Sequence, residues 1–280
     1  GQLPRYLDFF AADIIYYLPF LLAPLLFWPM RSGYRWLLAA VAIITLSFAF
    51  IAGVRTTFIF VCVAVLFFVL CRFWARKWYF VALVALLLGA GYFSRNYVTN
   101  PSIARYYSIF SIDTYNKFGN DGSISERKAI AKGVWEIAQD RLWLGYGPGW
   151  KKLSTVASEG GYIDHWKNGT EPWHQWAVNY FSLGAGRVNP HNFYLMVLFE
   201  TGALGLAAYL AFMLAIGFQS LLGSLSRNIS KDARGICLAV LVYIGTYLGA
   251  GLAGGPWLPV TLLVAASSVV LCRQPSRLGE

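Results

Sequence analysis

The fold of this chain is decided by the stretch FYLMVLFETGALGLAAYLAFMLAIGFQSLL, residues 193–222. It is apolar apart from Glu200 and a few small polar side chains. A run of this length exceeds the ~20 residues that an α-helix needs to cross about 30 Å of bilayer hydrocarbon. Because lipid offers no hydrogen-bond partner to the backbone, a segment that spans it must be helical. The stretch therefore predicts a transmembrane helix.

Similar apolar runs recur along the chain. They are Phe9–Trp28, Trp36–Ala52, Thr56–Cys71, Trp78–Phe93, Ile236–Leu252 and Trp257–Cys272. The composition agrees, because 58% of the residues are hydrophobic and only 13% are charged, against about 25% charged in a typical soluble domain. The mean hydropathy is +0.53. We predict an all-α polytopic membrane protein with about seven transmembrane helices and one large polar loop.

The distribution of cations predicts the orientation. Cytoplasmic connections carry an excess of Lys and Arg. One set of connections holds such residues, namely Arg31, Arg35, Arg72, Arg76, Lys77, Arg227, Lys231, Arg234, Arg273 and Arg277. The turn at Arg55, the segment 94–190 and the Gly254–Pro256 turn then lie outside. The sequence thus divides into helices over 1–93, an external loop domain over 94–190 and helices over 191–280.

The net charge, the number of helices and the cysteines narrow the possible functions and the organisation of the chain. Much of the net charge of +10 is explained by this topology signal, and the polar loop shows no basic stripe interleaved with aromatics, so no nucleic-acid partner is expected. An odd number of helices that starts outside, without an initiating Met, suggests the C-terminal portion of a longer protein. Cys62, Cys71, Cys237 and Cys272 are interpreted as apolar helix residues rather than a disulfide framework or a metal cluster.

The polar loop has helical structure of its own. Ser123 to Glu126 fits a capping box, which satisfies the first free amides of a helix. The residues at helical spacing after it predict one buried face, made of Arg127, Ile130, Ala131, Val134, Trp135 and Ala138. The helix should end before the breaker Gly145–Gly149. Arg127 then opposes the positive end of the helix dipole, so it either snorkels into water or faces an anion in a site.

Two more candidates lie at the outer surface of the membrane. Arg55 sits at a helix junction on the outer side, where topology gives no reason for a cation, and it is either an interfacial anchor or functional. His191 directly precedes the 193–222 helix and carries the side chain best suited to accept a proton near neutral pH, although chance placement is the alternative. Asn192 is either a plain N-cap or part of a site.

Weaker candidates complete the set. His165 and His174 have no convincing zinc spacing. The glycines of 145–149 favour a turn, because they lack the Lys-Ser/Thr pair of a phosphate loop. Glu200 is either a functional carboxylate within an apolar run or a link between helices. The loop aromatics favour a membrane belt, with sugar contact as the alternative, at Trp173, Trp176, Tyr180 and Phe181.

Several segments, taken in order, resemble the O-antigen ligase and polymerase family. They are Arg127 followed by Trp135, then Leu144–Gly149, Pro190–Leu195 and Phe199–Gly205. Arg55 matches in position the family's arginine before a helix start. The resemblance spans about residues 50–210 and looks most like the ligases that attach O-antigen to lipid A–core.

The resemblance implies a GT-C-like glycosyltransferase of the bacterial inner membrane, with its active site facing the periplasm. It would move a glycan from undecaprenyl diphosphate to lipid A–core, with inversion and without metal or cofactor. His191 would be the catalytic base, and Arg55 and Arg127 would bind and stabilise the departing diphosphate, as guanidinium forks do bidentately. Asn192 would belong to the substrate-binding residues, and membrane lipids are the remaining expected partners.

Other functions stay open at this point. An O-antigen polymerase or a protein O-oligosaccharyltransferase of the same family differs only in its acceptor, which no residue reveals. A transporter of the same lipid-linked glycan is the rival from another functional class, and a non-catalytic scaffold is a third.

Overall fold

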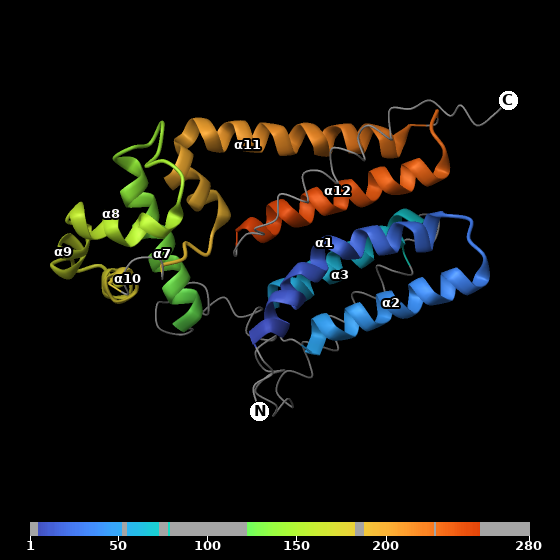
Figure 1. The fold of residues 1–280 in the computed structure, drawn as a ribbon, viewed down its shortest axis with the longest axis horizontal. Coiled ribbons are helices and arrows are strands. Elements are labelled where there is room, and N and C mark those ends of the chain that lie inside the picture. The colour runs from blue at the N-terminus through green and yellow to red at the C-terminus, as the bar shows by residue number, and fades with distance from the viewer. Residues whose placement is uncertain are drawn as a thin grey trace. The chain divides into compact units, whose positions relative to one another are not determined.

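The computed structural model describes residues 5–51, 55–72, 78, 122–182, 188–226 and 228–252. These residues form helices, turns and short connections, with no strand among them (Figure 1). Their contacts divide them into two compact units. The first, which we call the helix unit, contains α1, α2, α3, the part of α11 from Phe212 and α12 as far as Ala250. The second, the loop unit, contains α7 to α10, the part of α11 up to Ala211, Gly251 and Leu252.

Helices occupy the predicted apolar runs that fall within the described residues. They are α1 (Arg5–Phe27), α2 (Ser32–Ile51), α3 (Arg55–Arg72), α11 (Phe193–Leu225) and α12 (Lys231–Gly251). The runs Trp78–Phe93 and Trp257–Cys272 lie outside the described residues, apart from Trp78. By length and composition α11 and α12 can each cross a membrane, while the apolar stretches Tyr16–Phe27, Ser32–Ser47 and Ile59–Arg72 are shorter. The all-helical class is confirmed, and the count of seven spanning helices stays a prediction.

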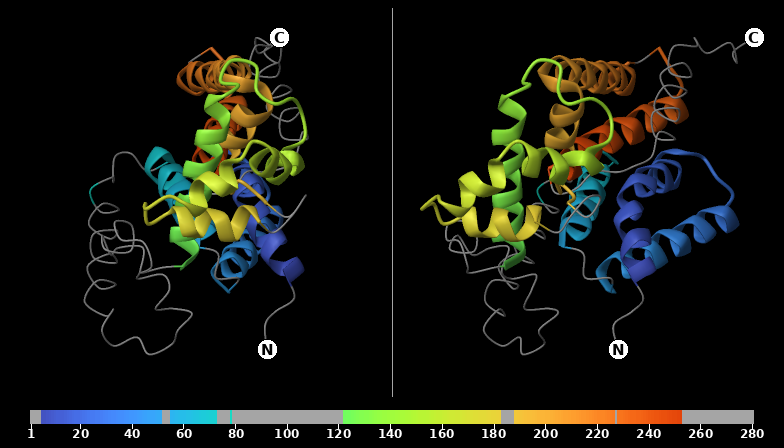
Figure 2. Two further views of the ribbon diagram at one scale, coloured as in Figure 1. Left: turned by 90° about the vertical axis from the view of Figure 1, so that its left-hand side faces the viewer. Right: turned by 60° about the vertical axis from the view of Figure 1, so that its left-hand side comes forward.

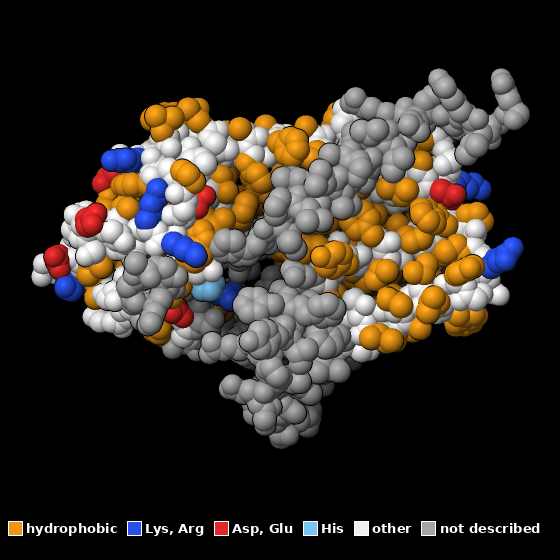
Figure 3. All heavy atoms as spheres, viewed as in Figure 1, with side chains coloured by type: hydrophobic (Ala, Val, Ile, Leu, Met, Phe, Trp, Pro, Cys, Tyr) orange, Lys and Arg blue, Asp and Glu red, His pale blue; other side chains and the backbone are white. Residues whose placement is uncertain are grey.

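The helices of the helix unit expose apolar side chains rather than burying them all. Leu214 and Phe218 of α11 are 61% and 58% exposed, and Ile43 and Ile44 of α2 are exposed as well. In Figure 3 hydrophobic side chains cover the described surface of these helices, and charged ones gather at their ends and over the loop unit. An extended apolar surface of this kind suits contact with lipid.

The helices of the helix unit pack together through aromatic rings and through glycines. Tyr16 of α1 meets Tyr243 and Tyr247 of α12, with ring centroids 6.0 and 5.9 Å apart. Gly249 of α12 lies against the ring of Phe60, where a Cβ would come within 2.5 Å of the ring. Small residues bring apolar helices close enough for van der Waals packing, which drives helix association in lipid.

Among the described cysteines, the interpretation as apolar helix residues outside any disulfide is wrong at Cys237. Cys272 lies outside the described residues. Cys62 and Cys71 are free, as expected of apolar helix residues, but Cys237 is disulfide-bonded. Spacing alone did not indicate this bond, because a disulfide depends on which parts of the chain meet in the folded protein.

The loop unit is built on α7 (Gly122–Gln139). Around it lie η4 (Trp150–Lys152), α8 (Leu153–Glu159), α9 (Tyr162–Lys167) and α10 (His174–Phe181). Both α8 and α10 pack against α7 (Figure 2). The core contains Trp166, Phe181 and Phe199. Burying a phenylalanine side chain contributes about 1.5–3 kcal/mol to the free energy of folding, relative to leaving it exposed. The described part of the polar segment is therefore mainly helical, as predicted.

The buried face of α7 differs from the predicted one. Ile130, Val134 and Ala138 are buried as expected, but Trp135 is 48% exposed and Arg127 is exposed. The buried side also includes Ala129 and Ile137, so its centre is rotated away from Trp135. The reason is that α8 and α10 cover α7 from that side only, which periodicity does not reveal.

The predicted single helix over 193–222 is broken at Gly202. This residue has φ 69° and ψ −172°, so α11 consists of helical segments over 193–201 and 203–225. The breaker Gly145–Gly149 fits against the break. Tyr146 and Gly147 donate backbone hydrogen bonds of 2.7 and 2.9 Å to the carbonyls of Phe199 and Glu200. The N–H of Ala203 donates in turn to the carbonyl of Leu142, at 2.6 Å.

We call this contact between 142–150 and 199–204 the glycine clasp. A Cβ on Gly145 would lie 2.6 Å from the backbone nitrogen of Gly202, and one on Gly202 would lie 2.3 Å from the carbonyl carbon of Trp143. Both residues also have positive φ, which only glycine adopts without cost. Both positions therefore require glycine for two independent reasons.

Replacing Gly202 by alanine is expected to destabilise the loop unit by about 2–5 kcal/mol, from the left-handed backbone and the overpacking together. Thermal unfolding of the purified protein, followed by tryptophan fluorescence, measures the change. Gly161→Ala is the matched control, because Gly161 has φ 75° but a Cβ there would meet open space. Equal losses in the two variants would contradict a close backbone contact at Gly202.

Candidate active site

Residues 188–192 lead into α11 and are held in place by Tyr180 of α10. The Tyr180 hydroxyl donates to the carbonyl of Asn189 at 3.0 Å and accepts from the N–H of the same residue at 3.1 Å. Val188 and Pro190 are buried on either side of it. The hydroxyl of Tyr180 thus bonds both the backbone N–H and the backbone carbonyl of Asn189. These two bonds fix the path of the chain just before His191.

His191 has φ 49°, the only positive φ of a non-glycine residue among those described. The left-handed region costs an L-residue roughly 1–2 kcal/mol. The side-chain oxygen of Asn189 accepts the N–H of His191 at 2.9 Å and so stabilises the turn. Backbone strain of this kind clusters at functional sites and persists only when the surroundings enforce it.

The imidazole of His191 is partly buried beside the ring of Tyr180, with centroids 6.3 Å apart. Burial lowers the pKa of His191 below its ordinary value of 6.5, and the positive charge of Arg127 lowers this pKa further. Both causes disfavour the imidazolium. His191 is therefore neutral at neutral pH, the state in which it can accept a proton.

Arg127 lies in the second turn of α7 and is exposed. Among the described residues none forms a hydrogen bond or an ion pair with it, but its charge acts on both His191 and Tyr180. The structure thus brings together two of the sequence-predicted residues, Arg127 and His191. A guanidinium without a protein partner beside a neutral imidazole can bind an anion while the imidazole takes up a proton.

Asn192 is the N-cap of α11. Its Oδ1 accepts the N–H of Leu195 at 3.1 Å, and its Nδ2 donates to the carbonyl of Leu252 at 3.4 Å. This is the structural alternative that the sequence left open. Both polar atoms of the side chain have partners within the protein, so a contact with substrate stays a prediction.

Arg55 is the first residue of α3 and belongs to the helix unit. Its side chain lies outside the described part of the structure, so its role stays a prediction.

Glu200 has a structural role in the glycine clasp. Its Oε1 accepts the backbone N–H groups of Gly149 and Trp150, at 3.1 and 2.7 Å. These are free amides at the start of η4, where a carboxylate is electrostatically favoured. Of the two alternatives for this carboxylate, the structure therefore favours the structural one.

The belt interpretation of the loop aromatics is wrong for three of them. Trp173, Tyr180 and Phe181 are buried in the core of the loop unit. The sequence missed Tyr180 and Asn189 as residues that position His191. Asn189 carried a usable signal, since Asn before Pro favours a turn, but nothing local links it to Tyr180.

His165 and His174 approach each other edge to face, with ring centroids 6.1 Å apart. His165 faces Glu136, at 3.7 Å between Nε2 and Oε1. No group of three or more His, Cys, Asp or Glu side chains within the described residues is arranged to hold a metal ion.

Comparison with known proteins assigns the chain to a family. The sequence model of the O-antigen ligase family matches residues 39–210, which include α7, the glycine clasp, His191 and Arg55. No curated protein matches the chain. The match and the apolar helices α11 and α12 indicate a membrane protein, and members of this family are glycosyltransferase-like enzymes. Because the match covers well over half of the sequence, the chain belongs to the O-antigen ligase family.

Proposed function

We propose that the protein is an O-antigen ligase, which transfers a glycan from undecaprenyl diphosphate to lipid A–core at the periplasmic face of the inner membrane. The observation that carries the proposal is an exposed Arg127, without a hydrogen bond or ion pair to any described residue, whose charge acts on a neutral, strained His191 in a chain of this family. The first can hold a diphosphate and the second can activate a hydroxyl.

The proposed reaction is a direct displacement. A hydroxyl oxygen of the acceptor attacks the anomeric carbon of the donor glycan, and the bond from that carbon to the diphosphate oxygen breaks. The proton of the hydroxyl passes to His191. Attack from the side opposite the leaving group inverts the anomeric centre, and undecaprenyl diphosphate leaves with the bonding electron pair.

The departing diphosphate becomes more negative as the bond to the sugar breaks, and a guanidinium beside it stabilises that charge. Arg127 supplies one guanidinium, and Arg55 supplies the second in this proposal. Two guanidiniums can fill the role that a divalent cation has in other transferases, so we propose that transfer needs no metal. Arg127 has a second effect, because its charge keeps His191 unprotonated until the acceptor proton arrives.

The position of His191 suits a donor carried by a lipid. It lies two positions before α11, whose apolar segment 203–225 continues beyond the break at Gly202 and is long enough to cross a membrane. The reacting carbon would be reached from the lipid side while the acceptor approaches from the polar side.

His191→Ala is expected to reduce transfer by about 10²–10⁴-fold, the usual contribution of a general base. The assay joins purified lipid-linked glycan to purified lipid A–core in the presence of EDTA. His165→Ala is the matched control, since His165 is an exposed histidine of the same unit. Transfer by the alanine variant at the wild-type rate would exclude a catalytic role for His191.

The same assay separates the remaining functions. A ligase variant without His191 still binds the donor but does not transfer it, whereas a transporter would still move the donor across vesicles. Glycan or protein acceptors in place of lipid A–core test the polymerase and the protein transferase. Transfer that requires a divalent cation would contradict the two-guanidinium mechanism.

The pH dependence of transfer is expected to report the lowered pKa of His191. The rate should hold as pH falls through 6.5 and drop only at lower pH, where the imidazole becomes protonated. Arg127→Gln removes one cause of the lowering, so the acid limb of its profile should move to higher pH, towards 6.5. Single-turnover rates normalised to each variant's own maximum measure this. Lys151→Gln, an exposed cation of the same unit, should leave the limb in place.

The strained backbone of His191 gives a separate test. Glycine adopts φ 49° freely, so His191→Gly should be more stable than His191→Ala by about 1–2 kcal/mol, with transfer lost in both. Thermal unfolding of the two variants measures the difference. An alanine variant as stable as the glycine variant would mean that the left-handed turn is not imposed on residue 191.

A further inference from the structure

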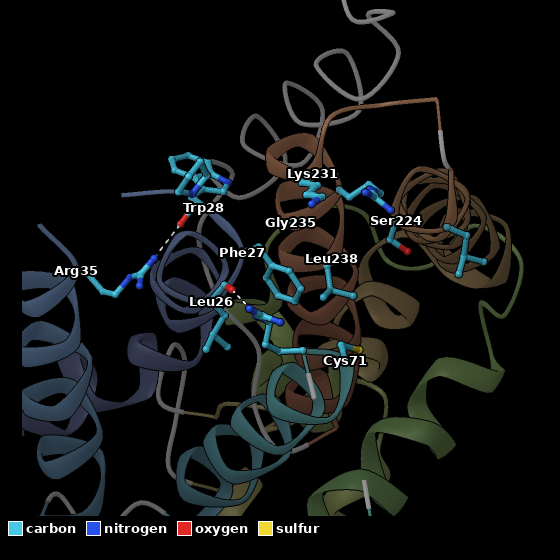
Figure 4. Close-up of a pocket in the computed structure, with 13 residues that line it drawn as sticks. Leu26, Phe27, Trp28, Arg35, Cys71, Ser224, Lys231, Gly235 and Leu238 are labelled. Atoms are coloured by element: carbon cyan, nitrogen blue, oxygen red, sulfur yellow. Dashed lines mark hydrogen bonds between the residues drawn. The ribbon is translucent and has the colours of Figure 1, made fainter. Parts of the chain in front are cut away.

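A cavity of about 730 Å³ lies at one end of the helix unit and takes no part in the proposed reaction (Figure 4). It is bounded by the end of α1, the start of α2, the ends of α3 and α11 and the start of α12. We call it the basic cavity, because four of its lining residues are cations, Arg35, Arg72, Lys231 and Arg234. No carboxylate is among the described residues that line it.

Helix capping accounts for part of this charge. Arg72 donates through Nε to the carbonyl of Leu26 at 3.0 Å, and Arg35 reaches the carbonyl of Trp28 at 3.5 Å. These carbonyls belong to the end of α1, where cations are favoured. Capping is therefore a sufficient reason for the position of Arg72 and a weaker one for that of Arg35.

Capping does not explain Lys231 and Arg234. Both lie in the first turn of α12, at the positive end of its dipole, where a cation is disfavoured. The Nε of Arg234 is buried and has no hydrogen-bond partner within the part of the chain that the structure describes. Buried donors are nearly always satisfied, and an unsatisfied one at a cavity wall indicates an acceptor that the protein itself does not supply.

The remainder of the wall is apolar. Phe27 and Leu238 face the cavity between the cations, as the close-up shows (Figure 4). Gly235 lies against Phe27, where a Cβ would be 3.1 Å from the Cβ of that residue. A ligand that satisfies both parts of this wall carries an anionic group together with a hydrocarbon chain.

We propose that the basic cavity binds the phosphate group of an anionic membrane lipid, with an acyl chain along its apolar wall. The phosphate supplies the acceptor for Nε of Arg234 and offsets the cost of two cations at the start of α12. This end of the helices is the one that the sequence predicts to face the cytoplasm, where surface lipids are anionic and basic pockets between helices bind lipid head groups. The site is independent of the transferase reaction.

Native mass spectrometry of the full-length protein, titrated with phosphatidylglycerol or with phosphatidylcholine, tests the proposal. The wild type should bind phosphatidylglycerol saturably and in preference to phosphatidylcholine. The double variant Lys231→Gln, Arg234→Gln should lose about fivefold in affinity for each cation removed. Arg31→Gln is the matched control, because it removes a cation at the same end of the helices that does not line the cavity.

Each arm has an outcome that overturns the proposal. Equal binding of the two lipids by the wild type removes the anionic site. If Arg31→Gln loses as much affinity for phosphatidylglycerol as the double variant does, the binding comes from general surface charge and not from the basic cavity. Competition by glycerol phosphate at the affinity of the intact lipid would make the site one for soluble phosphates. If the double variant fails to fold, the same lipid and glycerol phosphate titrations are made on the wild type and on Arg234→Lys, which keeps the charge. These titrations still decide whether the cavity binds an anionic lipid.

Discussion

The glycine clasp is the contact on which the candidate site depends. Backbone hydrogen bonds join 142–147 to 199–204, and the two backbones can approach because Gly145 and Gly202 have no Cβ. The carboxylate of Glu200 caps the turn that follows. Because the clasp holds the break at Gly202, the segment 193–201 packs within the loop unit and its Phe199 enters the core. His191 stands directly before that segment. The segments around Gly145 and Gly202, far apart in the sequence, are thus the two sides of one contact.

Once the start of α11 is fixed, a few contacts determine the backbone conformation and the protonation of His191. Tyr180 and Asn189 hold its backbone in the left-handed region, which would otherwise be unfavourable by roughly 1–2 kcal/mol. Burial and the charge of Arg127 both lower its pKa. Strain and electrostatics therefore favour one geometry and one protonation state, which is the preparation that a proton acceptor requires.

Arginines near the ends of helices have contrasting surroundings in this protein. Arg72 donates to a helix-end carbonyl, whereas Arg127 has no hydrogen bond or ion pair and Arg234 has an unsatisfied buried Nε among the described residues. A cation near the start of a helix opposes the dipole, and a bound anion would offset that cost, whereas a cation near the end of a helix is favoured. This difference, rather than the number of cations, separates candidate binding residues from topology signals.

The sequence by itself determined the features that are local in the chain. Apolar runs specify helices, the glycines of 145–149 specify a turn, and the segments that carry Arg127 and His191 resemble the family, because each depends on neighbouring residues. Tertiary structure alone decided which face of α7 is buried, that α11 breaks at Gly202, that Tyr180 clamps Asn189 and that Arg234 lines a cavity. These features arise from packing between elements that are distant in sequence. Periodicity cannot specify such contacts, because it describes the surface that a helix offers and not the partner that covers it.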